Sequence, residues 1–292
     1  MAGHDTSRRN DVFGGGGRVL GNRQAPWGRP SGQPVALGPP CRRRGCLVPM
    51  NVPGSWWWPN RLARVPRATT AALLAGLGAV LFGVPALLIT TGAVSWDARL
   101  FRILNQVPAA AASVLTPLSR LFLPTAIIVV VALAVVYVVA RNRSVLPVAG
   151  GAVAAGTAWA LAHVAKAIAD RPRPYQVIAG AALRQQPAHG TSFPSSHTAI
   201  TLAVAIALVP FLPRALAAAG IGYAVLVGWS RVYLGVHYPL DVLAGAGIGM
   251  AAGGVILLAL GALLRHASRT ANGQNAAQGP GPRTGPEPRG DP

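Results

Sequence analysis

The chain has 292 residues, of which 52% are hydrophobic and only 11% charged, and its formal net charge is +19. Soluble globular domains carry about 25% charged residues, so this composition excludes an ordinary soluble domain and indicates an integral membrane protein. The positive charge raises the question of nucleic acid. However, 11 arginines precede the first apolar segment, and no basic stripe is interleaved with aromatic residues. We therefore predict no nucleic-acid partner and attribute the charge to cytoplasmic segments of a membrane protein.

The first 66 residues are rich in Gly, Pro and Arg and show no sustained hydrophobic period, so residues 1–66 are predicted to form a disordered, basic cytoplasmic tail. Met50 is a second candidate start, because "SWWWPNRLARVPR" after it has the aromatic and basic character of a flank before a first span. Residues 1–49 would then not belong to the native protein. Cys41 and Cys46 flank "RRRG" in this tail, and we interpret them as incidental, with no zinc site or disulfide framework.

Six apolar segments follow, and each is predicted to be a transmembrane helix because only helices satisfy all their backbone groups within the bilayer. The expected fold is therefore all-α: a polytopic membrane protein with six transmembrane helices in a bundle, over residues 67–266. The segment "SWDARLFRILNQV" has apolar residues at helical spacing and is expected to lie along the membrane interface. Residues 267–292 are predicted to be a disordered cytoplasmic tail. The six segments cover about 68–91, 122–140, 145–166, 197–212, 215–230 and 240–264.

The distribution of basic residues predicts the orientation. Arginines are concentrated in the first tail, in "RNR" at 141–143, at Arg214 and near the second tail. An excess of Lys and Arg marks cytoplasmic segments, so we expect a multi-pass protein of the cell membrane with both termini in the cytoplasm. The end of the third span, the start of the fourth, the end of the fifth and the start of the sixth then all face the extracytoplasmic side.

Those four outer ends carry most of the polar residues of the membrane region. The third span ends at Lys166, the only lysine of the chain, and "FPSSH" opens the fourth. Arginine and lysine bind phosphate oxygens, and two histidines can divide nucleophilic and acid–base work between them. Carboxylates are scarce here, which disfavours a two-metal site, so we predict metal-free phosphoryl transfer without a cofactor. The residues gathered at this face are Lys166, Arg171, Arg173, Ser195, Ser196, His197, Arg231, His237 and Asp241.

Three segments resemble the signature of the type-2 phosphatidic acid phosphatase superfamily. "KAIADRPRP" is similar to K-x6-R-P, and "PSSH" is similar to P-S-G-H, with Ser196 in place of the usual glycine. "SRVYLGVHYPLD" matches S-R-x5-H-x3-D. The three segments occur in the family's order.

The resemblance implies a role for each matching residue. His237 would be the nucleophile, Asp241 its orienting partner, and His197 the acid that protonates the leaving oxygen and later activates water. The phosphate-binding residues would be Lys166, Arg173, Ser195, Ser196 and Arg231. We expect His163 to line the bundle, His189 to be solvated, and Asp170 to pair with a neighbouring arginine.

The function expected from this resemblance is hydrolysis of a lipid phosphate monoester or diphosphate through a phosphohistidine, with membrane lipids as the surroundings. Polyprenyl diphosphate is slightly favoured over phosphatidylglycerophosphate and phosphatidic acid. A lipid-linked phosphotransferase would use the same site and remains open as an alternative. An anion transporter is disfavoured, because it would place its charges near the middle of the bilayer.

Overall fold

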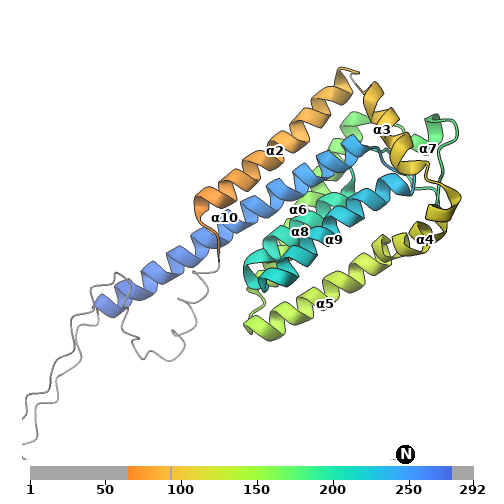
Figure 1. The fold of residues 1–292 in the computed structure, drawn as a ribbon. Coiled ribbons are helices and arrows are strands. Elements are labelled where there is room, and N and C mark those ends of the chain that lie inside the picture. Colours follow the sequence, from red (N-terminus) through yellow and green to blue (C-terminus); the bar gives the residue numbers. More distant parts are fainter. Residues whose placement is uncertain (1–64, 93, 278–292) are drawn as a thin grey trace, which may run out of the picture. The chain divides into compact units, whose positions relative to one another are not determined.

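The computed structural model describes residues 65–92 and 94–277, and all the regular structure in these ranges is helical (Figure 1). This confirms the all-α prediction for the described part of the chain. Residues 1–64 of the predicted first tail, both cysteines and residues 278–292 lie outside the described ranges. The helices are α2 (Ala68–Thr90), α3 (Ser95–Asn105), α4 (Ala109–Ser119), η1 (Arg120–Phe122), α5 (Pro124–Asn142), α6 (Leu146–Ala169), α7 (Pro174–Val177), α8 (Ser196–Leu208), η2 (Val209–Phe211), α9 (Arg214–Tyr233) and α10 (Pro239–Ala277).

Five of the helices in the described ranges, where six were predicted, are long and apolar enough to cross a membrane: α2, α5, α6, α9 and α10. The predicted fourth span corresponds to α8 and η2, which together cover only Ser196–Phe211. A helix of 13 residues measures about 20 Å, well short of the roughly 30 Å of a bilayer core. The six-span prediction is therefore confirmed only in part: five of the predicted spans are helices of membrane length, and the fourth is the shorter apolar segment of α8 and η2.

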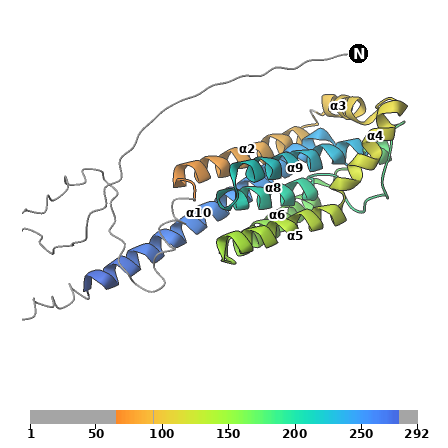
Figure 2. The same cartoon turned by 60° about the horizontal axis from the view of Figure 1, so that its bottom comes forward.

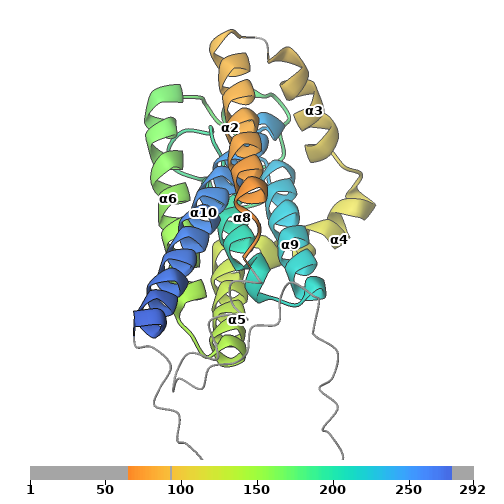
Figure 3. The same cartoon turned by 90° about the vertical axis from the view of Figure 1, so that its left-hand side faces the viewer.

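The short helix α8 forms part of the core of the bundle, which explains how it can be short and apolar. It packs against α6, α9 and α10, and the three views show it among these helices (Figures 1, 2 and 3). Eight of its 13 residues are buried. Small side chains allow this close packing; the shared core of α6, α8 and α10 contains Ala154, Ala158, Ala162, Ala199, Ala203, Ala207 and Ala252.

Helices α2 and α10 lie side by side over much of their length (Figure 3). Their backbones approach most closely at Gly78 and Gly247, where a Cβ on either residue would meet backbone atoms of the opposite helix. At its other end α10 continues to Ala277, so the boundary predicted at 266 lies inside a helix.

The chain between α2 and α5 contains more helix than predicted. The segment expected to lie along the interface is helical, as α3. Two further short elements, α4 and η1, follow it, and the next membrane-length helix begins at Pro124, where Pro suits a first turn. Residues 109–122 therefore lie beside the end of the bundle where α9 finishes, and η1 contacts α9.

Candidate active site

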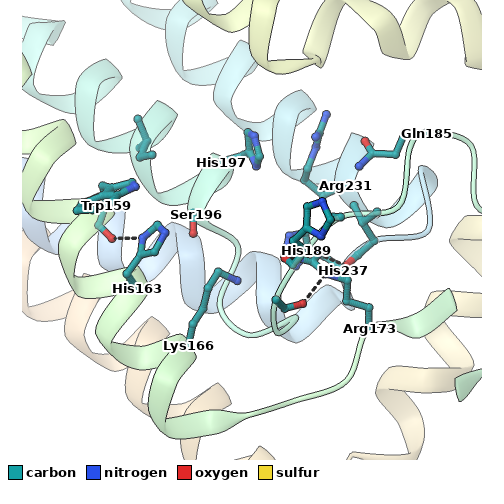
Figure 4. Close-up of a pocket in the computed structure, with 14 residues that line it drawn as sticks. Trp159, His163, Lys166, Arg173, Gln185, His189, Ser196, His197, Arg231 and His237 are labelled. Carbon is teal, nitrogen blue, oxygen red and sulfur yellow. Dashed lines mark hydrogen bonds between the residues drawn. The ribbon is translucent and has the colours of Figure 1, made fainter. Parts of the chain in front are cut away.

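A cavity of about 570 Å³ lies where the end of α6, the start of α8, the end of α9 and the turn before α10 come together (Figure 4). Four different segments of the chain therefore supply its walls. Six of the eight predicted site residues line it, namely Lys166, Arg173, Ser196, His197, Arg231 and His237. The two others, Ser195 and Asp241, do not line this cavity.

His237 lies in the turn between α9 and α10, where its backbone N–H donates to the carbonyl of Arg231. Its side chain is buried, and Nδ1 lies 3.5 Å from Oδ2 of Asp241, without a hydrogen-bond partner among the described residues. Burial lowers the pKa of His237 to about 4, although the carboxylate of Asp241 acts in the opposite direction. The ring is therefore neutral at pH 7, and Nε2 is the nitrogen left for a reaction.

Asp241 is held by three donors within a buried network. Its Oδ1 accepts a 2.7 Å hydrogen bond from Nη1 of Arg171, and its Oδ2 accepts from the Tyr238 backbone N–H at 2.8 Å. The Ser192 hydroxyl donates to the same Oδ2. These bonds fix the carboxylate beside His237, with Oδ2 3.5 Å from Nδ1 of the ring.

Arg171 connects this network to α3. Its Nη2 donates to Oδ2 of Asp97 at 2.7 Å, and Oδ1 of Asp97 accepts from the backbone N–H of Leu240. The guanidinium carbon lies 3.9 Å from the centroid of the Tyr238 ring. Asp97 and Asp241 are both fully buried, so Arg171 provides the compensating charge that buried carboxylates need.

The sequence predicted no role for Asp97 or Ser192, and it placed Arg171 at this face without a role. The neighbour Asp170, which was expected to pair with an arginine, is exposed and closes α6 with φ at 36°. The one available signal was Asp97 itself, a rare carboxylate in a segment with apolar residues at helical spacing.

Two of the cations keep donors available for a ligand. Lys166 donates from Nζ to the carbonyls of Thr191 at 3.0 Å and Ser192 at 3.2 Å, which uses two of its three protons. Arg231 is buried and donates from Nη2 to the carbonyl of Phe122 and to the hydroxyl of Ser230. Its Nη1 has no partner within the described ranges.

Arg173 is engaged differently from its predicted phosphate-binding role. Its Nε, Nη1 and Nη2 donate to the carbonyls of Gly190, Val236 and His189, each at 2.9 Å. The guanidinium thus joins the loop at 189–190 to the turn that carries His237. It also lines the cavity, so its charge contributes to the field there.

The two serines of "PSSH" point to different surroundings. Ser196 lines the cavity, and its buried hydroxyl oxygen has no hydrogen-bond partner among the described residues. The hydroxyl of Ser195 accepts from Oγ1 of Thr198 at 3.0 Å, while its backbone N–H donates to the carbonyl of Asp241. Ser195 therefore holds the start of α8 against α10, next to the His237 turn.

The start of α8 also requires a glycine on α10. A Cβ at Gly245 would meet the backbone carbonyl of Ser195. Because Gly245 has no side chain, the two backbones can approach closely, and His197 enters the cavity from the first turn of α8. This contact positions the second histidine of the site.

The other two histidines considered also lie at the cavity wall (Figure 4). Nδ1 of His163 lies 2.8 Å from the carbonyl of Trp159, and the two rings are 4.3 Å apart. His189 is exposed, as expected, and its carbonyl accepts from Arg173. Within residues 65–92 and 94–277, no group of three or more His, Cys, Asp or Glu is placed to hold a metal ion.

The arrangement as a whole suits an anion with several oxygens. A neutral histidine and a second histidine face the same space as a lysine, an arginine with a free nitrogen and a serine hydroxyl without a partner. Phosphate groups are bound by this combination of point charge, guanidinium and hydroxyl.

Comparison with known proteins finds similar sequences. Over 85 residues the chain is 39% identical to the undecaprenyl-diphosphatase of Sulfolobus acidocaldarius, which covers 29% of this chain and 41% of that protein. It is 44% identical over 52 residues to the undecaprenyl-diphosphatase BcrC of Bacillus subtilis, covering 18% and 26% respectively. The chain therefore matches less than half the length of these curated relatives.

The crystal structure of LpxE from Aquifex aeolicus is similar over 55% of this chain and 93% of its own, with 30% identity and a TM-score of 0.46. Residues 127–265 match the family model of the PAP2 superfamily. This range contains all three motifs and every residue predicted for the site. The part of the chain that carries the site therefore belongs to the PAP2 superfamily.

Proposed function

We propose that this protein is a membrane lipid phosphatase that hydrolyses a phosphate monoester or diphosphate of a lipid. The proposal rests on one observation: a single cavity at one end of the bundle is lined by His237, His197, Lys166 and Arg231. These residues come from four separate segments of the chain. The five helices long and apolar enough to cross a membrane support a substrate that resides in the bilayer.

The proposed first step is attack by Nε2 of His237 on the phosphorus, which forms an N–P bond. The bond between phosphorus and the lipid oxygen breaks, and His197 donates a proton to that oxygen. Lys166, Arg231 and Ser196 stabilise the charge on the remaining phosphoryl oxygens. Asp241 stabilises the positive charge that the ring of His237 acquires.

In the second step, His197 takes a proton from a water molecule, whose oxygen attacks the phosphorus. The N–P bond breaks, orthophosphate leaves and His237 is regenerated. The site supplies its positive charge through side chains, so we propose that the reaction is independent of divalent metal.

Among lipid substrates we favour a polyprenyl diphosphate. Two curated relatives that match the chain are undecaprenyl-diphosphatases, which supports this choice. We further propose that the cavity opens on the extracytoplasmic side, in accordance with the arginine distribution.

The test is phosphate release by the purified protein in detergent with EDTA, using undecaprenyl diphosphate, phosphatidylglycerophosphate and phosphatidic acid. The His237→Ala substitution removes the nucleophile, so the rate of phosphate release should fall at least about a thousandfold. His197→Ala should cost about a hundredfold or more, because it removes general acid catalysis.

His266→Ala is the matched control, since His266 lies near the far end of α10 and is exposed. It should retain wild-type release. Undiminished activity of the His237→Ala protein would exclude the phosphohistidine route, and loss of activity in EDTA would contradict the metal-independent mechanism.

A further inference from the structure

A second cavity, of about 480 Å³, adjoins the first. Its walls come from the end of α4, η1, the first residue of α5 and the loop at 184–188. Gln185, Ala188, His197 and Arg231 line both cavities. His237, Lys166 and Arg173 line only the first. The two spaces therefore meet at His197 and Arg231.

Their relation to the reaction rests on the proposed function. In phosphoryl transfer the leaving group lies opposite the nucleophile, on the side where the general acid donates its proton. His237 belongs to the first cavity alone, whereas His197 belongs to both. The second cavity is therefore placed to receive the group that His197 protonates.

The lining of the second cavity is suited to a negatively charged leaving group. Arg184 is already engaged, because its Nη1 and Nη2 donate to the carbonyls of Tyr233 and Asn105. Arg120, on η1, is exposed, and its side chain makes no hydrogen bond or ion pair with the rest of the described chain. Besides Arg231, which lines both cavities, it is the cation of this cavity that remains available to a ligand.

Gln185 supplies a second unsatisfied group at the junction. Its Oε1 is buried and has no hydrogen-bond partner in the described ranges. A half-turn of the amide would present its NH₂ group at the same place, so the side chain can donate to a phosphate oxygen there. Figure 4 shows Gln185 beside Arg231, at the side of the first cavity away from Trp159 and His163.

We propose that the second cavity binds the phosphate that stays on the lipid when a lipid diphosphate is cleaved, with Arg120 as its cation. The terminal phosphate would occupy the first cavity and the lipid-linked phosphate the second, on either side of His197. Arg120 is then a specificity-determining residue that favours diphosphates over monophosphates. When a lipid monophosphate is cleaved, the lipid leaves as a neutral alcohol, which makes no use of this charge.

The experiment compares kcat/KM for a polyprenyl diphosphate and a polyprenyl monophosphate of the same chain length. In the Arg120→Gln protein the value for the diphosphate should fall about tenfold, the loss expected for one charge-assisted contact, and that for the monophosphate should fall much less. Arg120→Lys should recover part of the loss. Arg99→Gln is the matched control, because Arg99 is an exposed arginine of α3 that lines neither cavity, and it should leave both values unchanged.

Calorimetric titration of the same proteins with inorganic pyrophosphate and orthophosphate gives a second readout that needs no turnover. Arg120→Gln should weaken pyrophosphate binding more than orthophosphate binding. Equal losses for the two ligands, or no loss for either, would overturn the assignment of the second cavity. A wild-type protein that cleaves no lipid phosphate would instead refute the proposed function. The titration would still show whether Arg120→Gln weakens pyrophosphate binding selectively.

Discussion

His237 sits beside a carboxylate that is already occupied by Arg171, Ser192 and the Tyr238 backbone. Nδ1 of the imidazole makes no hydrogen bond to Asp241, and burial dominates, which lowers the pKa of His237 from 6.5 to about 4. A nucleophilic histidine must be neutral. Because its pKa is lowered, the neutral form persists as the pH falls and is lost only near pH 4.

We therefore expect the acid limb of the pH profile of kcat/KM for phosphate release to lie near pH 4, because kcat/KM reports the free enzyme. Initial rates measured from pH 3.5 to 9 at a fixed lipid-to-detergent ratio would establish it. An acid limb at about 6.5, the ordinary value for histidine, would show that His237 is solvated or is not the nucleophile.

Helices α8 and α10 meet at a contact on which the site depends. The carbonyl of Ser195 lies where a side chain at Gly245 would be, and Gly245 is one turn beyond Asp241. Gly245→Ala should thus destabilise the protein by about 1–3 kcal/mol, as overpacking does. It should also lower the rate of phosphate release, since it displaces the start of α8 and with it His197.

Thermal unfolding in detergent and the phosphate-release assay together measure both effects. Gly222→Ala on α9 is the control, because a Cβ there meets no atom within 4 Å. If Gly245→Ala behaved like Gly222→Ala in both assays, the close contact would not control the position of His197.

The two ends of the helix bundle should lie on opposite sides of the membrane. Gln186 is exposed in the loop at the cavity, and Arg214 is exposed at the start of α9, at the helix end opposite Arg231. With Cys41 and Cys46 replaced by Ser, we expect Gln186→Cys to react with a membrane-impermeant maleimide in intact cells. Arg214→Cys should react only after permeabilisation, and the reverse pattern would contradict the proposed orientation.

Much of the cavity could be predicted from the sequence because its residues occur in short motifs with fixed spacing. Lys166, His197, Arg231 and His237 indeed line one space. Asp97 and Arg171 could not be paired in this way, because their contact depends on how α3 packs against the start of α10. The burial of α8 within the bundle was equally hidden, since hydropathy does not distinguish an apolar helix in the lipid from one buried among other helices.

The three carbonyls bound by Arg173 have a consequence for the path of the substrate. One guanidinium bonds the loop at 189–190 to the turn of His237, so this wall of the cavity is held in place. Swinging it aside would leave a buried cation without its three acceptors, which is a large cost for each turnover. We therefore expect the lipid substrate not to enter through that wall. Its head group would instead enter laterally between helices, while the hydrocarbon tail stays in the bilayer.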